Sequence, residues 1–252
     1  MPPLHIAFRA DRKSLTVGQA PIIIGTLSSL ARKFPAPRQE VGCDVVEVRL
    51  DKMTYPPDWL ARCRHIQEQG WPVILTVRLQ SEGGDWEDGD ARRLPIFEEA
   101  LPELSAVDIE WRSHIVHRVC IAAKRCRKIS IVSYHDFKKT PPAADLAAII
   151  IEAQKIASIV KIATRLNSQA DDDILRLLLA QKWKRPLCLI GMGPSWTQTR
   201  LLYPQLGSCL SYGFLDKPAA PGQLPAAEMA RLLREQKPLP ENGRETGFLK
   251  KI

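Results

Sequence analysis

The sequence contains no apolar run that approaches the roughly 18 residues of a membrane-spanning helix. Its N-terminus, MPPLHIAFRADRK, also lacks the long apolar region of a signal peptide. The chain has 252 residues, of which 45% are hydrophobic and 25% are charged. Such a composition can bury a sizeable core and is not typical of a disordered chain. We therefore expect a folded, cytoplasmic protein that does not contact the membrane.

Paired cysteine motifs are also missing. The six cysteines are scattered along the chain, and no two of them form a CxxC pair. In a chain of this size, such cysteines are expected to be reduced and to lie mostly in the core. The sequence therefore predicts neither a disulfide framework nor a zinc site. The cysteines are Cys43, Cys63, Cys120, Cys126, Cys188 and Cys209.

Long basic runs are absent, although the formal net charge is +8. The basic residues occur in short clusters such as AKRCRK and KWKR, without the interleaved aromatics that are typical of single-strand binders. A basic chain can bind nucleic acid or attract small anions. The scattered pattern favours a small anionic ligand, and a steep salt dependence of DNA or RNA binding would favour the alternative.

Eight short apolar, β-branched runs recur along the chain, and successive runs begin 21 to 34 residues apart. That spacing leaves room for a strand, a loop, a helix and a second loop. Eight such units in a chain of this length predict an α/β fold, the (β/α)8 TIM barrel. A doubly wound open sheet is the alternative, but GTLSSLARK after the first run does not match its GxGxxG turn. The runs cover 21–27, 44–50, 72–79, 106–112, 129–135, 157–163, 186–192 and 207–213.

The segments between these runs have helical patterns. Residues 171–173 are three aspartates, which suit a helix N-terminus. Residues 4–20 precede the first run and predict a β-hairpin that could plug the lower end of the barrel. No domain boundary is visible, so 1–252 is predicted to be a single barrel domain with a tail over 237–252. Helices are expected within 58–70, 142–157, 169–183 and 225–237.

Ionisable residues gather where the predicted strands end. In a TIM barrel the active site is built from the C-terminal ends of the strands and the loops that follow them. At least five of the eight runs place such residues there, and unrelated structural accidents would not do so. In chain order these residues are Glu47, Arg49, Arg78, Glu82, Asp108, Glu110, His135, Lys161, Arg200 and Gln223.

Each of these residues also has a purely structural interpretation. Glu47 and Arg49 lie on the same side of one strand and could form an ion pair inside the barrel. His135 could cap the helix that follows it. Lys161 could pair with Asp108 or Glu110 only to fill the barrel. The convergence of the whole set at one end of the barrel is the observation that favours an active site.

Lys161 carries the chemical argument, because it lies in the apolar stretch ASIVKIA. A buried ammonium is costly unless it is compensated, whereas a desolvated lysine among other cations can be neutral and nucleophilic. Its natural target is a carbonyl, which gives a Schiff base that activates the proton on the adjacent carbon. His135 is suited to move that proton, and arginines are suited to hold a carboxylate. The expected substrate is a small carboxylate that bears a ketone.

Six motifs in order give the chain a family resemblance. From about Pro21 to about Glu235, it resembles type I 3-dehydroquinate dehydratase, the Schiff-base enzyme of the shikimate pathway. The motifs are EVRLD at 47–51, TVRLQSEGG at 76–84, VSYHDFKKTP at 132–141, VKIA at 160–163, the loop 192–200, and APGQ at 220–223.

The resemblance implies a reaction and a role for each residue. Lys161 would form an imine with the C3 ketone of 3-dehydroquinate. His135 would remove the C2 proton and protonate the departing C1 hydroxyl, which gives 3-dehydroshikimate and water by syn elimination, and Glu82 would orient His135 or the substrate. The resemblance also implies a homodimer and no metal or organic cofactor. The ring hydroxyls and the carboxylate would be held by Glu47, Arg49, Arg78, Arg200 and Gln223.

Three positions depart from the family pattern. Ala219 stands where the family often has Ser or Thr, so a hydrogen bond of the closing loop is expected to be missing. Pro194 and Trp196 stand where smaller residues are usual, and Trp196 could alter the packing of the loop or the pocket wall. Two alternatives stay open: another Schiff-base barrel such as a class I aldolase, and a non-catalytic paralogue that binds a shikimate-type metabolite.

Overall fold

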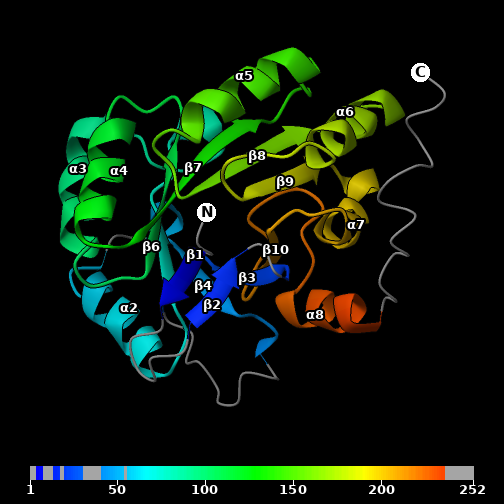
Figure 1. Cartoon of the computed structure of the whole chain (residues 1–252). Coiled ribbons are helices and arrows are strands. Elements are labelled where there is room, and N and C mark those ends of the chain that lie inside the picture. The colour runs from blue at the N-terminus through cyan, green and yellow to red at the C-terminus, as the bar shows by residue number, and fades with distance from the viewer. Residues whose placement is uncertain (1–3, 8–13, 18–19, 31–40, 54–55, 236–252) are drawn as a thin grey trace.

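The computed structural model describes residues 4–7, 14–17, 20–30, 41–53 and 56–235 of the chain. Eight parallel strands form one sheet in the order β10–β3–β4–β5–β6–β7–β8–β9, with helices between them (Figure 1). Each predicted run overlaps one of these strands, so the predicted TIM barrel is confirmed. The predicted tail over 237–252 lies outside the described residues, and the single-domain assignment of 1–252 stays a prediction.

The elements have the following bounds. The barrel strands are β3 (Ile22–Leu27), β4 (Val45–Arg49), β5 (Val73–Thr76), β6 (Ala106–Glu110), β7 (Ile129–Asp136), β8 (Ile159–Arg165), β9 (Leu187–Met192) and β10 (Leu210–Phe214). The helices are α2 (Trp59–Glu68), α3 (Gly89–Ala100), α4 (Val116–Arg125), α5 (Ala143–Ala153), α6 (Gln169–Leu179), α7 (Thr199–Gln205) and α8 (Ala226–Glu235). Short 3-10 turns follow three strands: η1 (Leu50–Lys52), η2 (Gln80–Glu82) and η3 (Pro194–Trp196).

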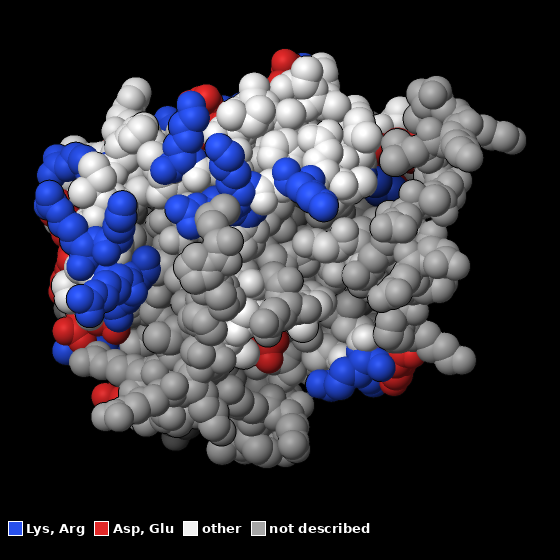
Figure 2. All heavy atoms as spheres, in the orientation of Figure 1, with Lys and Arg blue, Asp and Glu red and all other residues white. Residues whose placement is uncertain are grey.

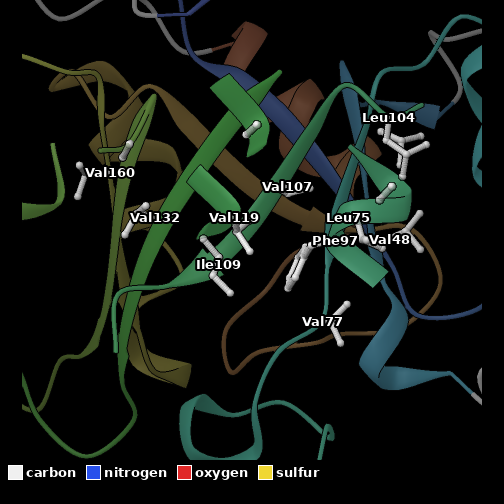
Figure 3. Packing of buried hydrophobic residues seen from close by; sticks show 14 of the residues in the cluster. Val48, Leu75, Val77, Phe97, Leu104, Val107, Ile109, Val119, Val132 and Val160 are labelled. Carbon is white, nitrogen blue, oxygen red and sulfur yellow. The ribbon is translucent and has the colours of Figure 1, made fainter. Parts of the chain in front are cut away.

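The outward side chains of the strands form the main hydrophobic layer, which lies between the sheet and the helices. Successive residues of a strand point to opposite faces, so β4 directs Val46 and Val48 outward and Glu47 inward. Figure 3 shows this layer around Val48, where valines and isoleucines of four strands pack with Phe97 of α3 and Val119 of α4. All of these side chains are fully buried, which fixes the position of each helix on the barrel.

The interior of the barrel has two halves of different character. Near the start of the strands it is apolar and β-branched, and it includes Ile24, Val45, Ile74 and Ile159. Near the end of the strands it is ionisable. There the inward positions hold Glu47, Arg49, Asp108, Glu110, His135 and Lys161, all of them buried. The charged half is therefore the part of the interior that can carry chemistry.

The barrel closes between β9 and β10 through a short seam. The backbone N–H of Cys209 donates to the carbonyl of Leu187 at 2.9 Å. The hydroxyl of Ser208 accepts from the N–H of Leu189 at 3.0 Å and contacts the carbonyl of Leu210 at 3.2 Å. A side chain therefore supplies part of the hydrogen bonding that a β ladder supplies elsewhere in the sheet.

The predicted N-terminal hairpin is present. Strands β1 (Leu4–Ala7) and β2 (Ser14–Val17) pair antiparallel and lie in front of the barrel in Figure 1. Val17 is buried with Ile22 and Leu210 in the apolar half of the interior. The hairpin therefore covers the end at which the barrel strands begin, opposite the charged half.

Local signals in α6 agree with the sequence. Ser168 and Asp171 form a reciprocal capping box at the start of α6, and Asp172 also lies in its first turn, as the run of aspartates predicts.

No helix in the described ranges is long and apolar enough to cross a lipid bilayer.

Candidate active site

One pocket at the end of the barrel where the strands finish is lined by all eight residues that the sequence analysis assigned to the site. Arg200 reaches it from α7 and Gln223 from the loop after β10, while the others lie on strands or directly after them. The eight residues are Glu47, Arg49, Arg78, Glu82, His135, Lys161, Arg200 and Gln223.

Lys161 lies on the floor of this pocket. Strand β8 carries it into the barrel, where it is 5% exposed. Its Nζ donates to Asp108 Oδ2 at 3.0 Å and lies 4.2 Å from the centre of the Tyr212 ring. The structural alternative in which Lys161 pairs with a carboxylate of β6 is therefore realised, with Asp108 as the partner.

Asp108 does not depend on Lys161 for its charge compensation. Its other oxygen, Oδ1, accepts from Arg78 Nη2 at 2.7 Å and from Ser133 Oγ at 2.6 Å. Burial alone would raise the pKa of Asp108, but Arg78 and Lys161 hold that pKa well below its usual range. Because Arg78 and Ser133 also bond to Asp108, its charge would stay compensated without Lys161.

His135 and Glu82 form the second unit of the site. His135 Nδ1 lies 3.0 Å from Glu82 Oε2, and the backbone N–H of His135 donates to the same oxygen at 3.0 Å. Burial, and then the charges of Arg78 and Lys161, lower the pKa of His135 well below its ordinary value, so the imidazole is neutral at pH 7. With Glu82 ionised, the ring proton lies on Nδ1 and Nε2 is left as a base.

Glu82 is poised to change charge near neutral pH. Burial raises the pKa of its carboxyl to about 7, although Arg78 and Arg112 act in the opposite direction. Its second oxygen, Oε1, lies 3.8 Å from Arg112 Nη1 and has no hydrogen-bond partner in the described part of the chain. Glu82 therefore lies between two groups: its Oε1 faces Arg112, which is exposed at the surface, and its Oε2 contacts the ring of His135.

Two of the site arginines are paired with acidic groups. Arg78 Nη2 lies 2.7 Å from Asp108 and Nη1 lies 3.3 Å from Glu110. Arg49 pairs with Asp51 of η1 at 2.7 Å. The suggested Glu47–Arg49 ion pair is therefore wrong: Arg49 donates two hydrogen bonds to Asp51 instead, and Glu47 accepts from Thr26 and Thr76.

Arg200 differs from the other two. Its guanidinium donates to the carbonyls of Gly222 at 2.9 Å, Tyr212 at 3.2 Å and Pro221 at 3.3 Å. No acidic residue of the described ranges pairs with it. Burial lowers the pKa of Arg200 to about 10, which still leaves it charged at neutral pH. It therefore holds a buried positive charge that an anionic ligand can neutralise.

A chain of hydrogen bonds ties the loop after β10 to the pocket. Gln223 Nε2 donates to Thr26 Oγ1 at 3.2 Å, and Thr26 donates to Glu47 at 3.0 Å. Gln223 Oε1 accepts from the backbone N–H of Ala219 at 2.8 Å. Ala219 therefore stabilises the loop through its backbone, although its methyl group cannot donate. Trp196 packs against the layer outside the barrel and does not line the pocket.

The remaining structural alternative, a helix cap at His135, does not occur. Asp136, rather than His135, accepts from the backbone N–H groups of Lys138 at 2.9 Å and Lys139 at 3.0 Å. His135 therefore caps nothing and is left free for chemistry. Lys138 and Lys139 are exposed, so neither is a buried amine that could replace Lys161.

Several pocket residues were not assigned to the site from the sequence. Asp108 was counted among the strand-end residues, but the only role suggested for it was to pair with Lys161. Thr26 and Tyr212 line the pocket, and Ser133 supports it by bonding Arg78 and Asp108. The alternation of inward and outward side chains could have identified all of these, since each lies two residues from another inward position. No cluster of metal-ligating side chains occurs among the residues described.

Comparison with known proteins gives a consistent result. A family model described as type I 3-dehydroquinase matches residues 20–240. The 3-dehydroquinate dehydratase of Methanocella arvoryzae is 34% identical over 195 residues, which are 77% of this chain and 88% of that protein. The 3-dehydroquinate dehydratase of Methanosarcina acetivorans is 37% identical over 210 residues, which are 77% and 86% of the two chains.

Solved structures agree with this. The crystal structure of the 3-dehydroquinate dehydratase from Aquifex aeolicus superposes with a TM-score of 0.74 at 30% identity, covering 86% of this chain and 100% of that one. The enzyme of the same name from Geobacillus kaustophilus superposes with a TM-score of 0.79 over 92% and 96% of the chains. Its 24% identity makes the second comparison evidence for the fold alone.

Proposed function

Because the chain belongs to the type I 3-dehydroquinase family, we propose that it dehydrates 3-dehydroquinate to 3-dehydroshikimate through an imine on Lys161. His135 acts as general base and general acid. The observation that carries this proposal is the placement around one pocket of a buried lysine, a neutral imidazole and an arginine that has no carboxylate partner among the described residues. These three groups are what imine-based elimination from a keto acid requires.

The reaction begins when the Lys161 ammonium passes one proton to the neutral imidazole of His135, leaves Asp108 and attacks the C3 carbonyl as the free amine. Loss of water gives an iminium, which withdraws electrons and makes the C2 proton acidic. The hydrogen bonds from Arg78 and Ser133 keep Asp108 ionised and in place during this step. Asp108 therefore serves as a fixed negative charge opposite the iminium that forms on Lys161.

His135 carries the proton transfers of the elimination. Its Nδ1 is held by Glu82, which directs Nε2 as the base that takes the C2 proton. The resulting imidazolium then protonates the C1 hydroxyl as that group departs, so one residue on one face of the ring gives a syn elimination. Water finally hydrolyses the iminium and releases 3-dehydroshikimate and Lys161.

Charge complementarity orients the substrate. Arg200 lacks a carboxylate partner within the described ranges, so the substrate carboxylate is its natural ligand. Glu47, Arg49, Arg78 and Gln223 line the rest of the pocket and are suited to hold the ring hydroxyls. Assembly as a homodimer and a cytoplasmic location stay predictions.

The proposal is tested by trapping the imine. Incubation with 3-dehydroquinate and then borohydride should leave a covalent adduct, with the mass of the reduced ligand, on the peptide that contains Lys161. Lys161→Ala should abolish the adduct and nearly all turnover. Lys161→Arg should not restore either, because a guanidinium keeps its proton. Lys139→Ala, which removes an exposed lysine, is the matched control and should leave both unchanged. An adduct on a different lysine would refute the assignment.

A further inference from the structure

Within the part of the chain that the structure describes, the hydroxyl of Tyr212 is a buried donor without an acceptor. Strand β10 directs this side chain into the barrel, where it lines the pocket and is 4% exposed. Its oxygen is closed to water and has no hydrogen-bond partner among the residues described. Buried hydroxyls normally have a hydrogen-bond partner. A buried hydroxyl that has none calls for an explanation, and a role in catalysis is one such explanation.

The neighbours of Tyr212 explain why its hydroxyl is unsatisfied. Burial, and then the charges of Glu47 and Asp108 among others, raise the pKa of Tyr212, so the phenol keeps its proton. Glu47 already accepts from Thr26 and Thr76, and Asp108 accepts from Lys161, Arg78 and Ser133. Both carboxylates are engaged by these donors, and within the described ranges the Tyr212 hydroxyl has a proton to donate and no acceptor at hydrogen-bond distance.

The ring of Tyr212 lies against the proposed nucleophile. Lys161 Nζ is 4.2 Å from the ring centre, which is within the range of a cation–π contact. Lys161 and Tyr212 come from alternate strands of the barrel, β8 and β10, as the side chains of one interior layer do. The ketone oxygen of the substrate is bonded to the carbon that Nζ attacks, so it will lie close to Tyr212.

We propose that the Tyr212 hydroxyl donates a hydrogen bond to the ketone oxygen of the substrate while Lys161 forms the imine, an inference that rests on the proposed function. As the C–N bond forms, the π pair of the carbonyl moves onto this oxygen. One amine proton and the proton that His135 has taken from the Lys161 ammonium then leave with the oxygen as water when the C–O bond breaks, and the second amine proton stays on the nitrogen of the iminium. Tyr212 keeps its own proton throughout, and its bond strengthens as negative charge develops on the oxygen.

A second buried tyrosine supplies a matched control. Tyr203 of α7 donates to Asp172 of α6 at 2.6 Å and lies outside the pocket. Its hydroxyl therefore has a structural partner, whereas that of Tyr212 has none. Tyr212→Phe should therefore slow adduct formation without lowering stability. Tyr203→Phe should lower stability without slowing adduct formation.

The experiment follows adduct formation in a single turnover, with 3-dehydroquinate added to excess enzyme and borohydride added at timed intervals. Tyr212→Phe should slow the appearance of the Lys161 adduct by about tenfold or more, as expected when one donor to a developing oxyanion is lost. Its midpoint of urea unfolding should be unchanged or higher. Tyr203→Phe should form the adduct at the wild-type rate and unfold at lower urea.

The outcomes separate the two proposals. If the wild-type chain gives no adduct on Lys161, the proposed function itself is wrong. If the wild-type chain and Tyr212→Phe form the adduct at the same rate, the proposed function stands and the role of Tyr212 is refuted. A slower adduct in Tyr212→Phe alone, with wild-type stability, supports the inference.

Discussion

At the scale of single residues, the protonation of Glu82 decides which nitrogen of His135 can act as a base. With Glu82 ionised, Nδ1–H donates to the carboxylate and Nε2 is free to accept a proton. With Glu82 protonated, Nδ1 becomes the acceptor and Nε2 carries the proton instead. Since the pKa of Glu82 lies at about 7, activity should fall on the acid side of that value.

Arg112 should set the position of this acid limb. Its charge lies 3.8 Å from Glu82 and lowers the pKa of that carboxyl. Arg112→Ala should therefore raise the pKa of Glu82 and move the acid limb of kcat/KM to higher pH, which lowers activity at pH 7. Glu82→Gln should remove the limb and leave a lower, flatter profile. Both are read from kcat/KM measured across the pH range.

Arg112→Lys is the control for this prediction, because it keeps the positive charge and should leave the limb close to its wild-type position. An acid limb that does not move in Arg112→Ala would show that another group produces it.

The sequence predicted which residues share the pocket, but it predicted few of their hydrogen-bond and ion-pair partners. Strand ends and residue types were enough to place Lys161, His135 and Arg200 in one pocket. They were not enough to show that Arg49 pairs with Asp51, because that contact depends on the 3-10 turn that η1 forms after the strand. Periodicity gives the face on which a side chain lies, whereas the choice of partner depends on distances of a few ångströms.

At the scale of elements, the turn after η2 fixes the relation between Glu82 and His135. Gly83 has a φ of +79°, and a Cβ at this position would overlap the ring of Phe137. That ring stacks on His135, with 6.3 Å between the ring centres and 17° between the planes. The absence of a side chain at Gly83 therefore allows the loop that carries Glu82 to approach the histidine.

Gly83→Ala should be compared with Gly89→Ala. Gly89 has nearly the same φ, +72°, but a Cβ there would meet nothing within 4 Å. Both substitutions should cost about 1 kcal/mol of unfolding free energy from backbone strain. Gly83→Ala should in addition displace Phe137 and lower kcat by about tenfold or more, because small errors in the position of a general base are costly. The measurements are urea unfolding and kcat, and equal kcat values for the two variants would contradict the argument.

Element positions were predictable, but some element ends were not. The run 72–79 predicts a strand that includes Arg78, whereas β5 ends at Thr76. The cause is two hydrogen bonds to residues that are distant in the sequence, which a local pattern does not reveal. The carbonyl of Val77 accepts from Arg93 of α3, and the N–H of Leu79 donates to Glu110. These bonds replace the ladder to β6 and turn the chain toward Glu82.

At the scale of the whole molecule, closure of the barrel depends on the seam between β9 and β10. Ser208→Ala should leave the buried N–H of Leu189 without its acceptor and cost about 1–3 kcal/mol of unfolding free energy. Hydrogen exchange at Leu189 should accelerate. Ser211→Ala is the control, since Ser211 donates to the carbonyl of Arg200 and not to the seam. Full protection of Leu189 in Ser208→Ala would show that the seam does not need the hydroxyl.

The distribution of charge and the assembly state lie beyond what composition could predict. Figure 2 shows Lys and Arg in separate groups along the left and upper edges of the face that carries the hairpin, with few Asp and Glu between them. The net charge of +8 gives only the sum. The order of the strands followed from eight repeated units, whereas a homodimer depends on the fit of two surfaces, which no repeat encodes.

The division of the barrel interior into an apolar half and a charged half affects the heat-capacity change of unfolding. Exposure of apolar surface raises the heat capacity of the unfolded chain by about 0.45 cal/K/mol per Å², and exposure of polar surface lowers it by about 0.26. A barrel with Glu47, Arg49, Asp108, Glu110 and Lys161 in its interior should therefore unfold with a smaller heat-capacity change than a barrel filled with valine and leucine. Its curve of stability against temperature should be correspondingly broad, so the free energy of unfolding is expected to change little between cold and warm conditions.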